Sequence, residues 1–361
     1  MPNRAFDGCG PLEPRTLQSH CIQVPVNIEH RKVMDQRVLD EPHTVVDRTA
    51  CVLRLEKGRR IGFAEYGAPE GLPVVVLHGT PGSRMLFEST DSVARKMGFR
   101  IVALDRAGYG LSDPHYHATL KDTAYDIQAL VNGLGINRFF LVGFSGGGPH
   151  ALAAALLMRD RIQQVALISP VGLVADAERV SMTSLQHFIF SYLGHSEAAA
   201  RVYFEGVRSM VSWFPHSAEY LVTQYATETD RAILDRYGLR HSLGTSMREG
   251  LSRSVEGAVQ DLRLYCRPWS LNLHKLETPV TIWQGSEDTI VPPEAAYRLE
   301  DVLPNCRLEV IEGMGHYWLF GSFERILDRI RTKPPRRKRT ASGPTQPDGS
   351  NDIDVYGTID L

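Results

Sequence analysis

Short runs of apolar residues recur along the middle of the chain and alternate with stretches whose apolar residues return every three or four positions. Six of the runs are continuous or interrupted by a single polar residue, a pattern typical of strands covered on both faces of a sheet. They are 74–77, 101–104, 139–142, 165–168, 280–283 and 308–311. The stretches with helical periodicity are 123–134, 148–158, 293–302 and 323–330. This alternation predicts an α/β fold with a mostly parallel, doubly wound sheet.

Two shorter strands are expected ahead of this alternation. Residues 52–55 and 61–64 flank the turn signal Lys57-Gly58, and together they are typical of a β-hairpin. Added to the six buried runs, the hairpin brings the expected sheet to eight strands.

The alternation is interrupted between Ile168 and Val280. No convincing buried strand lies in these roughly 110 residues, and a structureless loop of that length is uncommon in an α/β domain. The apolar spacing is helical, so we predict a helical cap over one edge of the sheet at 171–270. The segment is rich in aromatic residues: Phe188, Phe190, Tyr192, Tyr203, Phe204, Trp213 and Phe214. We expect most of them to form the core of the cap or to pack it onto the sheet.

Both ends of the chain are polar and irregular. Residues 1–47 contain five scattered prolines and predict a poorly ordered N-terminal arm. Residues 333–361 predict a disordered tail, whose basic run at 336–339 is either a localisation or phosphate-contacting patch or, as is more usual, a solvated stretch. The remaining segments, 48–170 and 271–332, make up the expected core domain.

The composition is that of an ordinary globular protein, with 43% hydrophobic and 23% charged residues in a chain of 361. A formal net charge of −2 gives no reason to expect nucleic acid or an anionic membrane as a partner. Its five cysteines are scattered and lack metal-ligand spacing, which favours reduced thiols over a disulfide framework. Without a membrane span or a secretory signal in the pattern, we expect a cytoplasmic location. The oligomeric state stays open.

The sequence Gly143-Phe144-Ser145-Gly146-Gly147 lies between a buried-strand run and a helical stretch, and it makes Ser145 the candidate nucleophile. A strand that turns abruptly into a helix crowds the positions two residues either side of the nucleophile, so glycines are needed there. The turn also places the hydroxyl at a helix N-terminus, where developing negative charge is favoured. An incidental serine in a glycine-rich turn is the alternative, and the flanking strand and helix argue against it.

A serine hydroxyl needs a base, and the base needs an acid that orients it. His316 follows the last predicted strand in a glycine-flanked loop, and Asp288 follows the strand that ends near Gln284. Both therefore lie at strand carboxyl ends, where open α/β sheets build their sites. Glu287 competes with Asp288, and we favour Asp288 because the shorter carboxylate at the end of the turn suits the usual geometry.

The negative charge that develops on the substrate oxygen needs donors fixed before reaction, normally backbone amides. One is expected from Gly146, directly after the nucleophile. The second is expected from Thr80, in the glycine- and proline-shaped loop after the 74–77 strand. We expect His78 in the same loop to be structural. No metal and no organic cofactor is implied.

Together these patterns resemble the α/β-hydrolase superfamily of serine hydrolases with a helical cap, over residues 48–332. The segments that carry the resemblance occur in the family's order: 78–83, 105–112, 143–148, 285–288 and 315–316. The resemblance implies a triad of Ser145, Asp288 and His316, with an oxyanion hole formed by the amides of Thr80 and Gly146. It also implies that Asp105-Arg106 is a structural turn that shapes the pocket without doing chemistry.

Differences within the superfamily narrow the choice. Epoxide hydrolases and haloalkane dehalogenases resemble this layout but carry aspartate at the nucleophile, so Ser145 argues against both. Proline iminopeptidases favour glycine where Thr80 stands and tryptophan where Gly146 stands, which weakens that assignment. Cofactor-free haloperoxidases and C–C bond hydrolases are similar enough to stay open.

We therefore expect a carboxylic ester hydrolase that works through an acyl-enzyme on Ser145. Its expected partner is a small-molecule substrate with an apolar acyl or alcohol group. The alternatives are an iminopeptidase-like peptidase, a C–C bond hydrolase, a cofactor-free haloperoxidase and, outside the enzymes, a ligand receptor or scaffold with the hydrolase fold.

Overall fold

The computed structural model describes residues 27–33, 45–174, 182–236 and 239–332. The expected disordered tail at 333–361, with its basic run, lies outside these residues, and so does most of the expected N-terminal arm.

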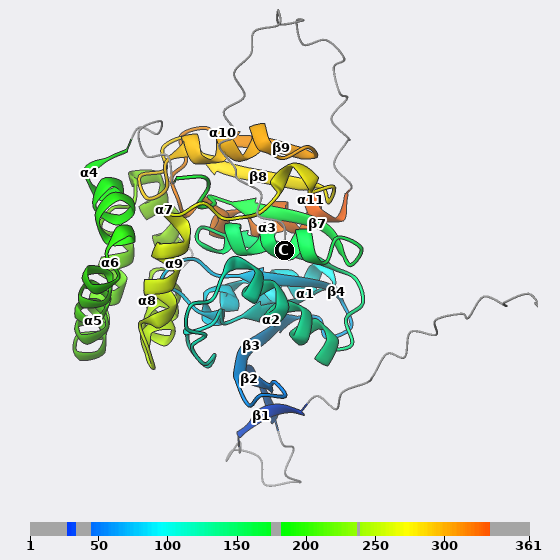
Figure 1. Ribbon diagram of the computed structural model, residues 1–361. Coiled ribbons are helices and arrows are strands. Elements are labelled where there is room, and N and C mark those ends of the chain that lie inside the picture. The colour runs from blue at the N-terminus through cyan, green and yellow to red at the C-terminus, as the bar shows by residue number, and fades with distance from the viewer. Residues whose placement is uncertain (1–26, 34–44, 175–181, 237–238, 333–361) are drawn as a thin grey trace, which may run out of the picture.

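A nine-stranded sheet with the strand order β1-β2-β3-β5-β4-β6-β7-β8-β9 forms the centre of the molecule (Figure 1). Its strands are β1 (Asn27–Val33), β2 (Val45–Arg54), β3 (Arg60–Gly67), β4 (Leu72–Leu77), β5 (Phe99–Leu104), β6 (Phe139–Phe144), β7 (Ile162–Ile168), β8 (Val280–Gly285) and β9 (Cys306–Ile311). From β5 to β9 across the sheet all pairings are parallel, whereas β1, β2 and β3 form an antiparallel extension. The predicted α/β class with a mostly parallel sheet is confirmed.

Helices cover both faces of the sheet. They are α1 (Asp91–Met97), α2 (Leu120–Gly133), α3 (Gly147–Leu157), α10 (Pro293–Val302) and α11 (Phe323–Arg331). Along β4, Val75 and Leu77 enter the core that α2, α3 and α10 share, while Val74 and Val76 enter the core with α1 and α11. Successive residues of a strand point to opposite faces, so a continuous apolar run is what a sheet covered on both faces requires.

The sheet has one strand more than the eight expected, because β1 lies inside the segment predicted to be poorly ordered. This strand pairs antiparallel with β2 at the edge of the sheet. Its side chain Ile28 packs on the core, and Glu29 forms an ion pair of 2.7 Å with Arg54 on β2. An edge strand with one apolar anchor among charged residues lacks the alternating or continuous apolar pattern by which strands are predicted.

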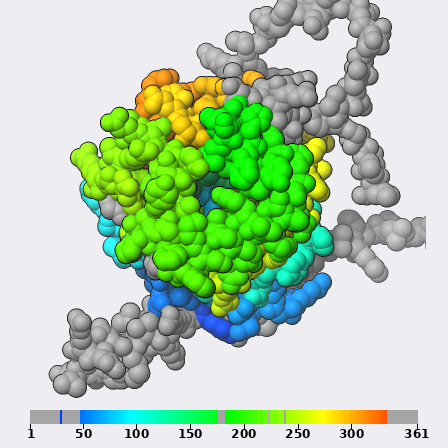
Figure 2. All heavy atoms as spheres, turned by 90° about the vertical axis from the view of Figure 1, so that its left-hand side faces the viewer, coloured from blue at the N-terminus to red at the C-terminus, as the bar shows by residue number. Residues whose placement is uncertain are grey.

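The long stretch between β7 and β8 is helical, and its described part from α4 to α9 is called the helical insertion below. It contains α4 (Ser184–Gln186), α5 (Glu197–Trp213), α6 (Pro215–Thr223), α7 (Glu228–Arg236), α8 (Leu239–Leu251) and α9 (Glu256–Tyr265). The insertion lies at one end of the strands, beside the helices that cover the two faces of the sheet (Figure 1). Figure 2 shows the insertion covering that end of the molecule.

The aromatic residues of the insertion behave differently from our expectation. Of the seven aromatic residues named in the sequence analysis, only Phe190 and Phe204 are buried in the core of the insertion. The others are substantially exposed, up to 65% for Phe214 and 80% for Trp213. Helix α5 buries a narrow apolar stripe, and Tyr203 and Trp213 of this helix lie outside it. No helix in the described ranges combines the length and apolar character needed to span a bilayer.

Candidate active site

Ser145 occupies the turn between β6 and α3, with the strained backbone expected of a nucleophile. Its φ is +52°, a left-handed conformation that is uncommon for a residue with a side chain. The turn has no room for side chains at its glycines, because a Cβ on Gly143 would lie 2.8 Å from the carbonyl oxygen of Gly147. A Cβ on Gly147 would lie 2.6 Å from the carbonyl oxygen of Leu77. The glycine pattern and the strained serine are therefore parts of one local structure.

His316 and Asp288 form a buried pair in the loops after β9 and β8. His316 Nδ1 lies 2.7 Å from Asp288 Oδ2, and both side chains are almost completely buried. Asp288 Oδ1 accepts hydrogen bonds of 2.9 Å from the amides of Ile290 and Val291, which fix the carboxylate. Glu287, the competing candidate, is exposed. Since Asp288 accepts a hydrogen bond from Nδ1 of His316, the other ring nitrogen, Nε2, is free to act as a base.

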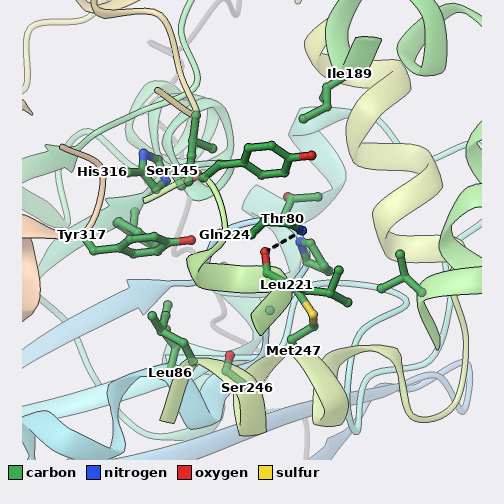
Figure 3. A pocket seen from close by; sticks show the side chains of 18 of the residues that line it. Thr80, Leu86, Ser145, Ile189, Leu221, Gln224, Ser246, Met247, His316 and Tyr317 are labelled. Carbon is green, nitrogen blue, oxygen red and sulfur yellow. Dashed lines mark hydrogen bonds between the residues drawn. The ribbon is translucent and has the colours of Figure 1, made fainter. Parts of the chain in front are cut away.

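Ser145 and His316 line the same cavity, of about 160 Å³ (Figure 3). The imidazole packs on the ring of Phe144, the residue before Ser145, with ring centroids 5.1 Å apart. Within the described residues neither Ser145 Oγ nor His316 Nε2 has a hydrogen-bond partner. Such a contact is often long in an enzyme without substrate and shortens when substrate binds.

The backbone amides of Thr80 and Gly146 are the two candidate oxyanion donors. Both residues line a second cavity, of about 110 Å³, that adjoins the first at Ser145. Neither amide donates a hydrogen bond to any group in the described part of the chain. Two unused donors beside a strained serine form the kind of arrangement that stabilises a developing oxyanion.

The side chain of Thr80 anchors this loop to the helical insertion. Its hydroxyl donates to Asp261 Oδ2 of α9 over 2.6 Å and lies 2.7 Å from the hydroxyl of Tyr265. Tyr265 also donates to the carbonyl oxygen of Gly146 over 2.9 Å. The space above Gly146 is consequently full, because a Cβ there would lie 2.2 Å from the Tyr265 hydroxyl.

A buried ion pair lies beneath the loop. Arg106 Nη1 donates to both oxygens of Asp261 over 2.6 and 2.7 Å, and Arg106 Nη2 donates to Thr80 Oγ1 and to the carbonyls of His78 and Gly79 over 3.2 Å. Burial opposes ionisation of Asp261, but Arg106 and then His150 hold its pKa well below the usual range. The Asp105-Arg106 turn therefore fixes, through Arg106, the loop that carries His78, Gly79 and Thr80, which we call the candidate oxyanion loop.

His78 is bound on both ring nitrogens and is not available as a base. Its Nδ1 lies 2.7 Å from the carbonyl oxygen of Gly79, and its Nε2 accepts from the amide of Arg106 over 3.2 Å. Burial and then the charge of Arg106 hold the pKa of His78 well below its usual range. A neutral, doubly bonded imidazole braces the loop, which is the structural role predicted for it.

Neither Asp261 nor Tyr265 was predicted from the sequence. Both belong to α9, far along the chain from the loop they contact, and no local pattern marks them. The one signal in the sequence is the position of Arg106 directly after a predicted buried strand, since an arginine that is buried there needs a carboxylate partner.

Comparison with known proteins agrees with this geometry. A family model described as alpha/beta hydrolase fold matches residues 73–322. The chain is 26% identical over 264 residues to a non-heme chloroperoxidase of Streptomyces lividans, covering 72% of this chain and 90% of that protein. It is 27% identical over 256 residues to a proline iminopeptidase of Lactobacillus helveticus, covering 68% of this chain and 83% of that protein.

Among solved structures, an esterase from Exiguobacterium antarcticum superposes with a TM-score of 0.59 at 22% identity, covering 78% of this chain and 99% of that chain. At that identity the likeness concerns the fold alone. The names of the three proteins describe different activities, so they agree on the family and not on one reaction. The family model spans more than two thirds of the chain, and we conclude that the protein belongs to the α/β-hydrolase family.

Proposed function

We propose that the protein is a serine hydrolase that cleaves a carboxylic ester through an acyl-enzyme on Ser145. One observation carries this proposal: the strained serine, the histidine of the buried His316–Asp288 pair and the residues of the two unused backbone amides all line two adjoining cavities. An acyl transfer needs a nucleophile, a base with its orienting acid, and an oxyanion site, and each of these groups is supplied.

The proposed reaction has two halves. His316 Nε2 takes the proton of Ser145 Oγ as that oxygen attacks the ester carbonyl, while Asp288 holds Nδ1 of the resulting imidazolium. The amides of Thr80 and Gly146 stabilise the tetrahedral oxyanion. The intermediate collapses, and His316 gives its proton to the leaving alcohol. In the second half His316 deprotonates a water molecule, which attacks the acyl-enzyme. The second tetrahedral intermediate then collapses and releases the acid, and His316 returns the proton to Ser145 Oγ.

The two cavities orient the substrate in this proposal. His316 must lie beside the leaving group to protonate it, and His316 lines only the larger cavity, together with Gln224 and Ser246 (Figure 3). The alcohol part therefore belongs in the larger cavity. The acyl part belongs in the smaller one, whose walls include Phe190 and Leu262 of the insertion. Apolar walls around the acyl group favour an apolar ester with a short acyl chain.

The packing above Gly146 argues against an iminopeptidase. That family favours tryptophan at this position and glycine where Thr80 stands. Here the Thr80 hydroxyl would lie 2.4 Å from a Cβ on Gly146, and the Tyr265 hydroxyl would lie 2.2 Å from it. The two departures from the iminopeptidase pattern are thus one structural feature, because the threonine fills the space that a tryptophan would need.

The test is labelling with a fluorophosphonate probe followed by a substrate panel. We expect the probe to label the native protein and to fail on Ser145→Ala. Ser246→Ala is the matched control, since Ser246 lines the same cavity without a catalytic role, and it should be labelled normally. A folded protein that is not labelled would support a receptor or scaffold instead.

The panel compares p-nitrophenyl esters of increasing acyl length with prolyl p-nitroanilide. We expect ester turnover that falls as the acyl chain outgrows the smaller cavity, with little turnover of the anilide. Robust anilide turnover without ester turnover would overturn the ester assignment. Tolerance of long acyl chains combined with sensitivity to the size of the alcohol would reverse the assignment of the two cavities.

A further inference from the structure

Helix α7 of the insertion contributes a carboxylate that contacts the main chain of the proposed catalytic base. The amide of His316 donates to Asp230 Oδ2 over 2.7 Å, and the amide of Tyr317 donates to Asp230 Oδ1 over 2.9 Å. Asp230 is completely buried. It lies in the first turn of α7, and its own amide donates to the hydroxyl of Thr227 over 3.2 Å. Each oxygen of this carboxylate therefore fixes one backbone amide in the loop after β9 that carries Gly315, His316 and Tyr317, which is called the histidine loop below.

The loop is built around this contact. A Cβ on Gly315 would lie 2.1 Å from Asp230 Oδ2 and 2.7 Å from Thr227 Oγ1, so only glycine lets the loop approach α7 this closely. The glycine before His316 therefore has a structural cause beyond loop flexibility: it admits a carboxylate from a helix that is 86 residues away along the chain.

Two carboxylates consequently flank His316 from different directions. Asp288 accepts from the imidazole ring, and Asp230 accepts from the main chain of the same residue. Burial raises the pKa of Asp230 above its usual value, while the amide of Tyr317 and the charge of His316 act in the opposite direction. A charged Asp230 would favour the imidazolium that forms when Ser145 loses its proton.

We infer that Asp230 is a positioning residue for His316, through which the helical insertion holds the base in place and stabilises its protonated form. This inference rests on the proposed function. It assigns to the insertion a part in catalysis as well as in forming the cavity walls. Asp230 touches neither cavity nor substrate, so its effect on the reaction passes entirely through the histidine loop.

The experiment compares Asp230→Asn with the wild type on a p-nitrophenyl ester across pH. Asparagine has nearly the same shape, but its amide nitrogen cannot accept from a backbone amide, so one contact and the charge are lost. We expect kcat to fall about 10- to 100-fold with KM changed less than about threefold, since a small misplacement of a catalytic group costs this much. The ascending limb of the kcat/KM profile should move to lower pH, because the imidazolium loses a nearby negative charge while Asp288 and Tyr317 stay in place.

Asp235→Asn is the matched control, because Asp235 lies on the same helix but is exposed and pairs with Arg240. It should leave kcat and the pH profile unchanged. If Asp230→Asn does not fold, Gly315→Ala tests the same contact from the other side by forcing the loop away from a retained carboxylate. It should lower kcat in the same way.

Two outcomes overturn the inference: kcat and the pH limb of Asp230→Asn equal to those of the wild type, or a lower Tm as the only change. Failure of the proposed function has a different signature, namely turnover that survives Ser145→Ala. If Ser145→Ala is inactive and Asp230→Asn matches the wild type, only the inference about Asp230 is wrong.

Discussion

The hydroxyl of Thr80 provides a direct test of how the oxyanion loop is held. Thr80→Val keeps the shape of the side chain and removes the oxygen that donates to Asp261, lies 2.7 Å from the Tyr265 hydroxyl and accepts from Arg106. Tyr265 still donates its hydrogen bond to the carbonyl of Gly146, and Arg106 still donates to Asp261 and to two backbone carbonyls. These remaining bonds partly compensate Tyr265 and Arg106 for the lost contact with the Thr80 hydroxyl. The donor to Asp261 is not replaced.

The magnitude follows from that one contact. A hydrogen bond to a charged group contributes about 1.5–3 kcal/mol, so the free energy of unfolding should fall by about that amount. Activity should suffer more than the fold, because the Thr80 amide is one of two proposed oxyanion donors. Complete loss of such a donor costs about 10²–10³ in kcat, and displacement by a fraction of an ångström should cost at least about tenfold.

Urea unfolding and kcat on p-nitrophenyl acetate measure the two effects separately. Thr80→Ser is the matched variant: it keeps the hydroxyl and should retain kcat to within about threefold of the wild type. A double-mutant cycle with Tyr265→Phe should show coupling, because the two hydroxyls are in contact. If Thr80→Val has the kcat of the wild type, the hydroxyl does not position the oxyanion amide and this reasoning fails.

Asp288 and Cys266 allow two further tests of the structure. Asp288→Asn should lower kcat by about 10⁴-fold, because the carboxylate holds the tautomer of His316, while Glu287→Gln should have little effect since Glu287 is exposed. Steady-state kinetics on the same ester would show the reverse order if Glu287 were the acid. Burial raises the pKa of the Cys266 thiol to about 12. At pH 8 Cys266 should therefore resist iodoacetamide in the native protein and react after unfolding, and mass spectrometry that found it alkylated in the native state would contradict its burial.

What the sequence could predict was local in origin. A buried parallel strand such as 74–77 must be apolar at every position, and the turn at Ser145 must have glycines two residues either side of it. His316 and Asp288 could be chosen because strand carboxyl ends converge on one edge of the sheet. Each of these requirements involves only a few consecutive residues, so it leaves a visible pattern.

The contacts that hold the site leave no such pattern. Thr80 contacts Asp261 although 181 residues separate them in the sequence, and His316 contacts Asp230 at a separation of 86 residues. An aspartate on an amphipathic helix normally faces solvent, so neither carboxylate differs in its sequence surroundings from Asp235, which is exposed. Strand β1 escaped prediction for a related reason, since an edge strand needs only one apolar anchor. Long-range pairing of polar residues has to be observed in three dimensions.

The positions of Asp261 and Asp230 in the insertion constrain how specificity can change in this protein. The insertion supplies cavity walls such as Phe204 and Leu262, so its replacement is an obvious route to a new substrate. Yet α9 anchors the oxyanion loop through Asp261, and α7 contacts the histidine loop through Asp230. Exchanging these helices whole would remove the anchors together with the walls, and loss of activity would then say nothing about the pocket. Substitutions at the walls that retain both carboxylates change the pocket without disturbing those anchors.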